Sequence, residues 1–273
     1  MNTILVTGAN GSLGSATLEA LRASGAPATG GSRTPGAGMR RLDFDDPSSL
    51  DLTEVATLVL VSAGYAEDDR VVARHAAVLD AAVRDGVRHV LYTSLTTAGD
   101  HLGFALAHRA TEHLVRASGL SWTILRNGLY AELFGGLLMW SGEGVESAFG
   151  DGALAAVARE DLADAAAIVA ADPAPHAERV YDLVGTPITA REVAGRLGVP
   201  HRTIGLGEYR RRLLDETPGL LPFQPPMLAS IATGVRHGFL AGTTPDLTAL
   251  LGRPARDPLA TAASASSTGR RSA

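Results

Sequence analysis

Three glycines near the start of the chain, Gly8, Gly11 and Gly14, are evenly spaced between an apolar run at 3–7 and a helical pattern. Gly8 permits a tight turn, Gly11 lets bare backbone approach a pyrophosphate, and Gly14 lets the helix pack closely on its strand. Amides at the helix N-terminus then face the anion. The residues between the glycines include Asn10, Ser12 and Leu13. This context favours a dinucleotide site over a merely glycine-rich turn.

The residues after the second predicted strand distinguish between two dinucleotides. An NAD site usually has a carboxylate about 20 residues beyond the glycines. No acidic residue occurs between Glu19 and Asp43. Ser32 and Arg33 occur there instead, and they suit a 2′-phosphate, so the sequence predicts NADPH; an ordinary surface role for Arg33 is the alternative. Asp43 and Phe44 are expected beside the adenine, with Phe44 equally suited to the core.

The chain contains no lysine, so all 24 of its basic residues are arginines. Many short-chain dehydrogenases use a lysine four residues after a tyrosine to lower the pKa of the phenol. The residues four positions beyond Tyr65, Tyr92, Tyr130, Tyr181 and Tyr209 are Asp69, Thr96, Phe134, Gly185 and Leu213. Alcohol oxidation or sugar-nucleotide epimerisation by that pair, and a lysine Schiff base, are therefore not expected.

Strand and helix patterns alternate along the first part of the chain, as a parallel doubly wound sheet requires. Further strands are predicted at 57–62, 88–93 and 121–126, and helices at 69–85, 105–118 and 161–171. The helix over 69–85 is expected to bury Val72, Ala76, Leu79 and Val83. The predicted fold is therefore α/β, a Rossmann-type doubly wound parallel sheet with a smaller C-terminal lobe.

The predicted division of the chain follows this pattern. Residues 1–150 are expected to form an NADP-binding Rossmann domain, to which segments from 160–185 return. Residues 186–257, with short helices near 189–197, 207–214 and 225–238, are expected to form a small, mixed, mostly helical substrate lobe. The Ala-, Ser-, Thr-, Gly- and Arg-rich stretch at 258–273 is expected to be a disordered tail.

Composition narrows the function classes. The absence of cysteine excludes disulfides, thiolate nucleophiles and cysteine-ligated metals, and no histidines with acidic partners have metal-ligand spacing, so no metal is expected. The net charge of −5 argues against nucleic-acid binding. The first residues lack a charged leader, and no apolar run approaches the ~20 residues of a membrane span. We expect a cytoplasmic protein with no membrane partner.

Polar residues follow several predicted strands, where ligands of parallel sheets lie. They are Ser62 and Ala63, then Tyr92, Thr93 and Ser94, then Asn127, Gly128, Leu129, Tyr130 and Glu132. His108 and Glu112 share a helix face four residues apart. These groups are expected to line the nicotinamide side. Alternatively, Tyr92 plugs the sheet and Asn127 positions the cofactor rather than acting as an acid.

The order of several motifs resembles the NmrA-like branch of the atypical short-chain dehydrogenases, and most of all its quinone oxidoreductase and triphenylmethane reductase types. The motifs are the glycine loop and residues 32–35, 92–95, 108–112, 118–130, 150–152 and 250–252. The resemblance implies a Rossmann domain, a C-terminal lobe and a cleft in which hydride leaves NADPH for a flat aromatic acceptor. It also places the phosphates on the glycine loop and Arg33, the adenosine on Ser62 and Ala63, and the nicotinamide at 127–132. His113 stands where quinone reductases of this type have a lysine.

An aromatic compound that accepts hydride gains negative charge on an oxygen, and that oxygen needs a hydrogen-bond donor from the protein. His108, Tyr130 and Asn127 are the candidate catalytic residues, although a lone helical histidine is more often structural. The apolar residues Phe134, Leu137, Met139 and Trp140 are interpreted as substrate pocket, core or dimer surface, which keeps a homodimer among the expectations. Two other functions stay open: a non-catalytic NADP(H)-binding regulator, and a tailoring reductase for one aromatic polyketide-like metabolite.

Overall fold

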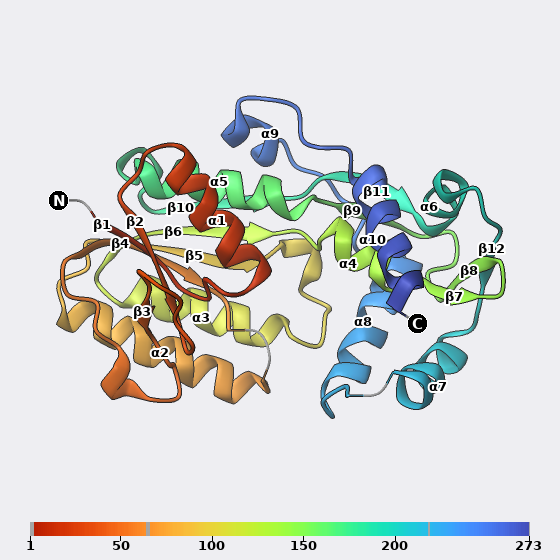
Figure 1. The fold of residues 1–273 in the computed structure, drawn as a ribbon, viewed down its shortest axis with the longest axis horizontal. Coiled ribbons are helices and arrows are strands. Elements are labelled where there is room, and N and C mark those ends of the chain that lie inside the picture. Colours follow the sequence, from red (N-terminus) through yellow and green to blue (C-terminus); the bar gives the residue numbers. More distant parts are fainter. Residues whose placement is uncertain (1–2, 64–65, 218, 273) are drawn as a thin grey trace.

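A parallel seven-stranded sheet forms the centre of the computed structural model, which describes residues 3–63, 66–217 and 219–272 (Figure 1). Its strands are β1 (Thr3–Val6), β2 (Ala28–Ser32), β3 (Arg40–Arg41), β4 (Val55–Val61), β5 (His89–Leu95), β6 (Ser121–Asn127) and β10 (Arg179–Leu183). Their order is β10-β6-β5-β4-β1-β2-β3, so the direction of winding reverses at β1. The predicted Rossmann-type α/β fold is confirmed, and its ligand crevice is expected at this reversal.

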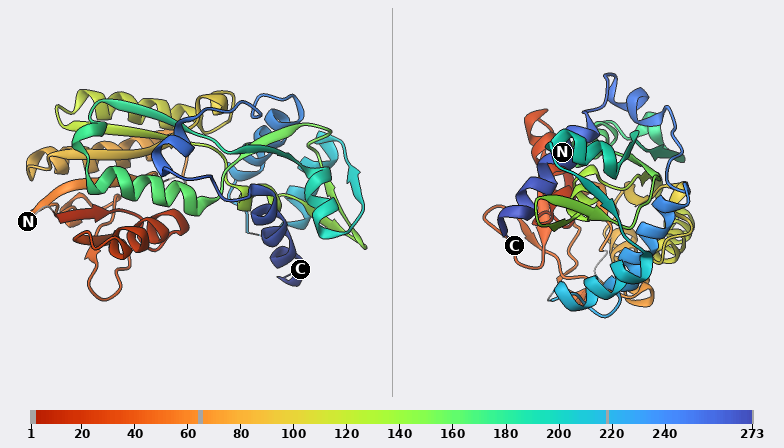
Figure 2. Two further views of the ribbon diagram at one scale, coloured as in Figure 1. Left: turned by 90° about the horizontal axis from the view of Figure 1, so that it is seen from above. Right: turned by 90° about the vertical axis from the view of Figure 1, so that its right-hand side faces the viewer.

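Helices cover both faces of the sheet (Figures 1 and 2). α1 (Ser12–Ala23), α5 (Arg159–Ala171) and α9 (Asp246–Leu251) lie on one face, and α2 (Asp68–Arg84) and α3 (Ala105–Ala117) on the other. Alternate side chains of β1 point to opposite faces, because Ile4 and Val6 join the core beneath α1 and α5 whereas Leu5 joins the core beneath α2 and α3. Strands buried on both faces explain the continuous apolar runs in the sequence.

The buried face of α2 differs from the predicted one. Leu79 is buried as predicted, together with Val71, His75 and Val78, whereas Val83, which was predicted to be inside, is 50% exposed. The apolar pattern misplaced the face because a histidine occupies one of its central positions. An imidazole is buried at low cost only where both of its nitrogens have partners, and such partners come from other elements.

The second lobe lies beside one end of the sheet, at the right of Figure 1. β7 (Met139–Ser141), β8 (Gly144–Ser147) and β12 (His201–Thr203) form a small sheet, and β9 (Ala153–Ala156) pairs antiparallel with β11 (Thr186–Thr189). Its helices are α4 (Ala131–Gly136), α6 (Ala190–Leu197), α7 (Leu206–Glu216), α8 (Gln224–Arg236) and α10 (Pro258–Ser272). The chain crosses between the two parts more than once: α4, β7 and β8 precede residue 150, and α9 returns to the large sheet. Single 3-10 turns are η1 (Pro47–Ser49), η2 (Thr97–Gly99) and η3 (Ala174–His176).

The prediction of a disordered tail is wrong for residues 258–272, which form α10. Ala262 and Ala263 are buried against α4, and a Cβ added to Gly135 would lie 2.0 Å from the carbonyl oxygen of Ala262. Trp140 Nε1 also donates to the carbonyl oxygen of Ser266 at 2.9 Å. Small side chains bury little apolar area each, but they let two helices approach closely, and close packing supplies the dispersion contacts.

Two kinds of feature are absent from the described ranges. No helix in them is long and apolar enough to cross a membrane. In the same ranges, no group of three or more His, Cys, Asp or Glu side chains is arranged to hold a metal ion.

Candidate functional site

The glycine loop between β1 and α1 has the shape of a phosphate cradle. Gly8 has a φ of +60°, and a Cβ added to Gly14 would lie only 2.3 Å from the carbonyl oxygen of Gly8. Gly11 donates to the same oxygen at 2.8 Å. No side chain caps the N-terminus of α1, and its first turn has no acidic residue. Those amides therefore suit an anion. The side chain of Ser12 is exposed, whereas that of Leu13 is in the core, so Leu13 offers only its backbone to a ligand.

Gly30 in β2 was missing from the predicted site. A Cβ added there would lie 2.6 Å from the Cβ of Ala9 in the loop, so the loop rests directly on this strand. The backbone of Ala9 also donates to Gly31 at 3.1 Å. Two adjacent glycines in a strand are the signal that would have found this contact, because they often mark a close backbone approach.

The loop after β2 is tied to the glycine loop through Asn10. Asn10 Nδ2 donates to the carbonyl oxygen of Thr34 at 2.7 Å, and the Thr34 N–H donates to Ser32 Oγ at 3.3 Å. Arg33 lies between Ser32 and Thr34 in the sequence. It is exposed and has no hydrogen bond or ion pair among the described residues. Its guanidinium has no partner among the described residues and is therefore available to an anion.

Asp43 and Phe44 follow β3. The carboxylate of Asp43 accepts the N–H of Asp45 at 3.1 Å and lies 3.8 Å from Arg41. Phe44 is half-buried and packs against the core beneath α2 and α3. Local bonds therefore hold Asp43, and Phe44 contributes to the core while keeping an exposed portion.

The carboxyl ends of β4 and β5 are joined by side-chain hydrogen bonds. The N–H of Ser62 donates to Thr93 Oγ1 at 3.1 Å, and the N–H of Ala63 donates to His75 Nε2 at 3.0 Å. Thr93 is buried, and Ser62 and Ala63 are half-buried. Thr93 and His75 thus hold the segment expected on the adenosine side, and the role of His75 is not evident from the sequence pattern.

Glu112 is the centre of an ion-pair cluster rather than a lining residue. Its carboxylate, 1% exposed, accepts from Arg126 at 2.7 and 2.9 Å, from Arg109 at 2.8 Å and from Ser94 Oγ at 2.7 Å. Burial alone would raise the pKa of Glu112, but the hydrogen bonds from Arg126 and Ser94 lower it below its ordinary value. Glu112 therefore stays charged, and Ser94 is engaged with it.

His108 in α3 and Tyr92 in the middle of β5 form a pair. The Tyr92 hydroxyl lies 3.0 Å from His108 Nδ1, and the tyrosine side chain is fully buried whereas His108 is half-buried. Burial raises the pKa of Tyr92 and lowers that of His108 to about 4. His108 is therefore neutral at pH 7. Tyr92 is buried within the sheet and offers a ligand no exposed surface.

Asn127, at the end of β6, carries a polar atom that the described residues do not satisfy. The side chain is 5% exposed, and its Oδ1 is buried without a hydrogen-bond partner among them. Buried polar atoms are almost always paired, so an unpaired acceptor indicates a missing donor. The backbone N–H of the neighbouring Gly128 donates to the carbonyl oxygen of Leu183 at 2.8 Å. Leu129 is buried in the second lobe. Together with the glycine cradle, this acceptor fits a bound dinucleotide.

Tyr130 and Glu132 lie at the start of α4, beside α5. The Arg159 guanidinium lies 5.1 Å from the centre of the Tyr130 ring, which packs on the core beneath α1 and α5. Glu132 accepts the N–H of Arg159 at 3.2 Å. Glu132 therefore caps the N-terminus of α5, and Tyr130 and His108 pack on the two opposite faces of the sheet.

The apolar stripe near 134–140 belongs to the core of the second lobe. Phe134 is fully buried and stacks on Phe149 with ring centres 4.9 Å apart. Leu137 is buried, and Met139 and Trp140 are half-buried against the same cluster. Of the alternatives considered for these residues, the structure favours core.

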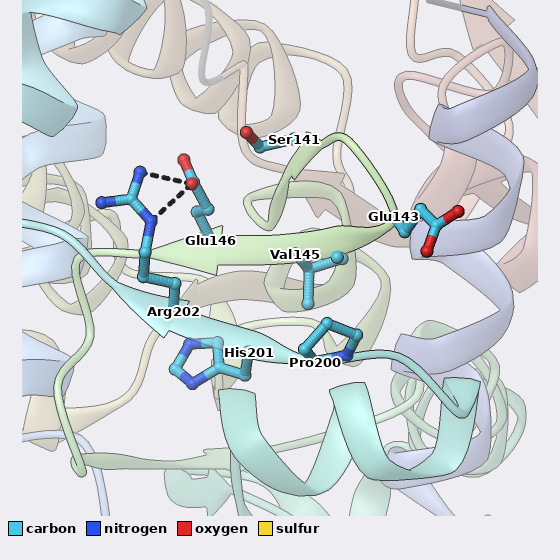
Figure 3. Close-up of a pocket in the computed structure, with 8 residues that line it drawn as sticks. Ser141, Glu143, Val145, Glu146, Pro200, His201 and Arg202 are labelled. Atoms are coloured by element: carbon cyan, nitrogen blue, oxygen red, sulfur yellow. Dashed lines mark hydrogen bonds and ion pairs between the residues drawn. The ribbon is translucent and has the colours of Figure 1, made fainter.

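A depression of about 310 Å³ occurs elsewhere in that lobe, lined by residues of the β7–β8 turn, β8 and β12 (Figure 3). Arg202 and Arg212 hold the buried carboxylate of Glu146 there. His201 Nε2 is bonded to Ser147 Oγ at 2.9 Å. No predicted site residue lines this depression, so it is separate from the candidate site.

Comparison with known proteins agrees with this arrangement. Residues 8–173 match the model of the NAD(P)H-binding family. The chain is 31% identical to quinone oxidoreductase 2 of Escherichia coli over 92% of its own length and 94% of that protein. It is 32% identical to an NmrA-like family domain-containing oxidoreductase of Aspergillus flavus, over 69% and 68%. Triphenylmethane reductase of Citrobacter sp., crystallised with NADP(H), superposes with a TM-score of 0.85 at 28% identity, over 96% and 99% of the two chains.

The resemblance predicted from the motifs is thereby confirmed, together with the NAD(P)H site and the oxidoreductase class. The chain belongs to the NAD(P)H-binding family, as an oxidoreductase of its NmrA-like branch.

Proposed function

We propose that this protein uses NADPH to reduce a quinone or a similar conjugated aromatic compound. The observation that carries the proposal is its similarity to quinone oxidoreductase 2 over nearly the full length of both chains. The absence of lysine supports it, because the tyrosine–lysine pair that serves alcohol substrates is missing. A quinone ring needs no such pair, since its reduced oxygen is a mild base that takes up a proton easily.

The chain's own residues would hold the cofactor at the carboxyl edge of the sheet. The amides of the glycine loop would bind the phosphates, and the Arg33 guanidinium the 2′-phosphate. The unpaired Oδ1 of Asn127 would accept a hydrogen bond from the nicotinamide carboxamide. When bound, NADPH supplies a hydride to the acceptor, which takes up one further proton.

His108 would assist the acceptor. With the buried Tyr92 hydroxyl donating to Nδ1, the neutral imidazole of His108 would carry its proton on Nε2. That N–H can donate to an oxygen that gains negative charge without His108 itself becoming charged. Tyr130 is the second candidate donor. Asn127, buried and placed at the end of β6, fits positioning rather than proton transfer.

Absorbance at 340 nm tests the proposal with purified protein, NADPH and a panel of benzoquinones and naphthoquinones. We expect NADPH to be consumed at a rate that depends on protein and quinone concentration. If the protein binds NADPH in calorimetry but no quinone in the panel causes consumption, the proposal fails and the regulatory function gains support. Consumption restricted to a single polycyclic acceptor would favour the tailoring reductase.

A further inference from the structure

His75 is a buried histidine that bonds to the segment after β4. It lies in the middle of α2 with no exposed surface. Its Nε2 accepts the N–H of Ala63 at 3.0 Å, and its Nδ1 lies 2.8 Å from Thr111 Oγ1 in α3. One imidazole therefore joins α2, α3 and the segment that leaves the carboxyl end of β4.

These contacts fix the proton on the His75 ring. A backbone N–H can only donate, so Nε2 must be the bare nitrogen and Nδ1 must carry the hydrogen. Thr111 Oγ1 donates to the carbonyl oxygen of Ala107 at 2.8 Å, so it is free to accept from Nδ1. Each donor in this series of hydrogen bonds has an acceptor. The tautomer of His75 that fits these bonds is the neutral form with its hydrogen on Nδ1.

The bond to His75 also orients the peptide group between Ser62 and Ala63. No described peptide bond is cis, so the carbonyl of Ser62 points opposite to the N–H of Ala63. Because that N–H is directed at α2, the carbonyl oxygen of Ser62 is directed away from α2. A second bond, from the Ser62 N–H to Thr93 Oγ1, holds the preceding peptide group.

We propose that His75 is a positioning residue of the cofactor site, which holds the Ser62–Ala63 peptide in the orientation that receives the adenosine half of NADPH. This inference rests on the proposed function and on the expectation, implied by the family resemblance, that the adenosine lies against Ser62 and Ala63. His75 does not touch the cofactor. It acts through the backbone at Ala63, and Thr111 in turn holds the ring.

The surroundings of His75 keep it neutral. Burial lowers its pKa to about 3, and the nearby groups His108 in α3 and Arg74 in α2 act in the same direction. The Tyr92 ring of β5 meets its edge with ring centres 5.6 Å apart. A protonated ring would lose the bond from Ala63, because Nε2 would then carry a hydrogen.

The test measures, by calorimetry, how variants at two buried histidines bind NADPH and adenosine 2′,5′-bisphosphate. The second ligand carries only the adenosine half of the cofactor. His89 is the matched control, because it is 4% exposed and bonded to Ser121 and Thr123. It is the first residue of β5 and therefore lies at the amino ends of the strands, away from the expected cofactor site. We expect His75→Leu to weaken both ligands roughly tenfold or more, because the freed Ala63 N–H reorients or stays unpaired. His89→Leu should leave both affinities unchanged while losing similar stability.

A second variant and a spectrum keep the test decisive if His75→Leu does not fold. His75→Gln retains an acceptor oxygen, so its affinity should fall between those of wild type and His75→Leu. Nitrogen–proton correlation spectra of the wild type should show a neutral His75 protonated on Nδ1. Protonation on Nε2, or equal affinities of folded His75→Leu and wild type, would overturn the positioning role alone. Failure of the wild type to bind NADPH would instead overturn the proposed function.

Discussion

Arg33 is the residue on which cofactor preference is expected to depend. It lies beside the glycine loop, exposed and without a described partner, while its neighbours Ser32 and Thr34 are bonded to each other and Thr34 to Asn10. The bonds of these neighbours hold the backbone around Arg33, and its guanidinium gives up no described protein partner when it binds a phosphate. The same charge gives no advantage to a dinucleotide that lacks the 2′-phosphate.

Replacing Arg33 by alanine should therefore weaken NADPH by about 1.5 to 3 kcal/mol and NADH far less, since charged hydrogen bonds to the phosphate are lost. Calorimetry with both dinucleotides measures this difference. Arg22→Ala, which removes an exposed arginine at the far end of α1, is the control and should affect neither ligand. Equal losses for both dinucleotides in Arg33→Ala would show that the arginine does not contact the 2′-phosphate.

His108→Ala should lower kcat for quinone reduction while changing the KM for NADPH little, because His108 faces the acceptor rather than the cofactor in our proposal. The expected loss is roughly a hundredfold, the lower end of the range for a positioned donor. Steady-state kinetics with His113→Ala as control measures it, since His113 is exposed on the same helix. If the two variants have the same kcat as wild type, Tyr130 becomes the remaining donor candidate.

Individual site residues differed in how far the sequence could predict their surroundings. The conformation of the glycine loop was predictable because it depends on local backbone geometry. Glu112 and Glu132 were expected to line the cofactor, but they bind Arg126 and the N–H of Arg159, which come from other elements. No spacing rule within one helix reveals such partners. The unpaired Oδ1 of Asn127 likewise becomes visible only when its surroundings are known.

At the scale of elements, the junction of β1 and α1 depends on Gly14. A methyl group there would meet the carbonyl oxygen of Gly8 at 2.3 Å, so Gly14→Ala should push α1 off its strand and abolish NADPH binding. Gly195→Ala is the control, because it lies within α6 with open space around it and should raise helix stability slightly. Dinucleotide binding and thermal unfolding separate the two effects. Normal NADPH affinity in Gly14→Ala would contradict the close packing.

The contact between α4 and α10 gives a prediction for the second lobe. Gly135→Ala should displace α10, because the added methyl would lie 2.0 Å from the carbonyl oxygen of Ala262. Trp140, whose Nε1 donates to Ser266 in α10, should then report the displacement as a shift in its fluorescence. Gly136→Ala is the matched control, since nothing lies within 4 Å of its added methyl. An unchanged spectrum and melting temperature in Gly135→Ala would contradict this packing.

Helices and strands were predictable where apolar residues recur with a regular period. They were less predictable where small residues such as alanine and serine form the element. The strands at 57–62 and 121–126 and the helix at 105–118 correspond closely to β4, β6 and α3. α10 was not predictable, because alanine and serine give little hydrophobic signal and its stability depends on the facing glycine of α4. The face of α2 was misplaced because His75 is buried through bonds to distant residues.

For the whole molecule, buried histidines predict a loss of stability in mild acid. Burial lowers the pKa from 6.5 to about 3 for His75 and to about 4 for His89 and His108. Unfolded histidines take up protons below pH 6.5 while the folded ones do not, so the unfolded state binds more protons and stability falls from pH 6.5 toward 4. Glu112, whose pKa is lowered from 4.5, adds its loss only at lower pH.

Chemical denaturation between pH 8 and pH 4.5 measures this dependence. We expect the free energy of unfolding to stay nearly level above pH 7 and to decline below pH 6.5, and His89→Gln should decline less steeply than wild type. His101→Gln, an exposed histidine, should follow the wild-type curve. A wild-type curve that is flat down to pH 4.5 would mean that the buried histidines accept protons without unfolding.

Hydride transfer from NADPH to the acceptor is tested most directly by a single-turnover experiment. It uses excess protein, a reactive naphthoquinone, and NADPH that carries deuterium on one or the other face at C4. A site that transfers hydride in a fixed orientation predicts that one deuterated form reacts more slowly than ordinary NADPH while the other reacts at the ordinary rate. No oxidation of protein-bound NADPH by the quinone, or oxidation at one rate for all three forms, would contradict hydride transfer at this site.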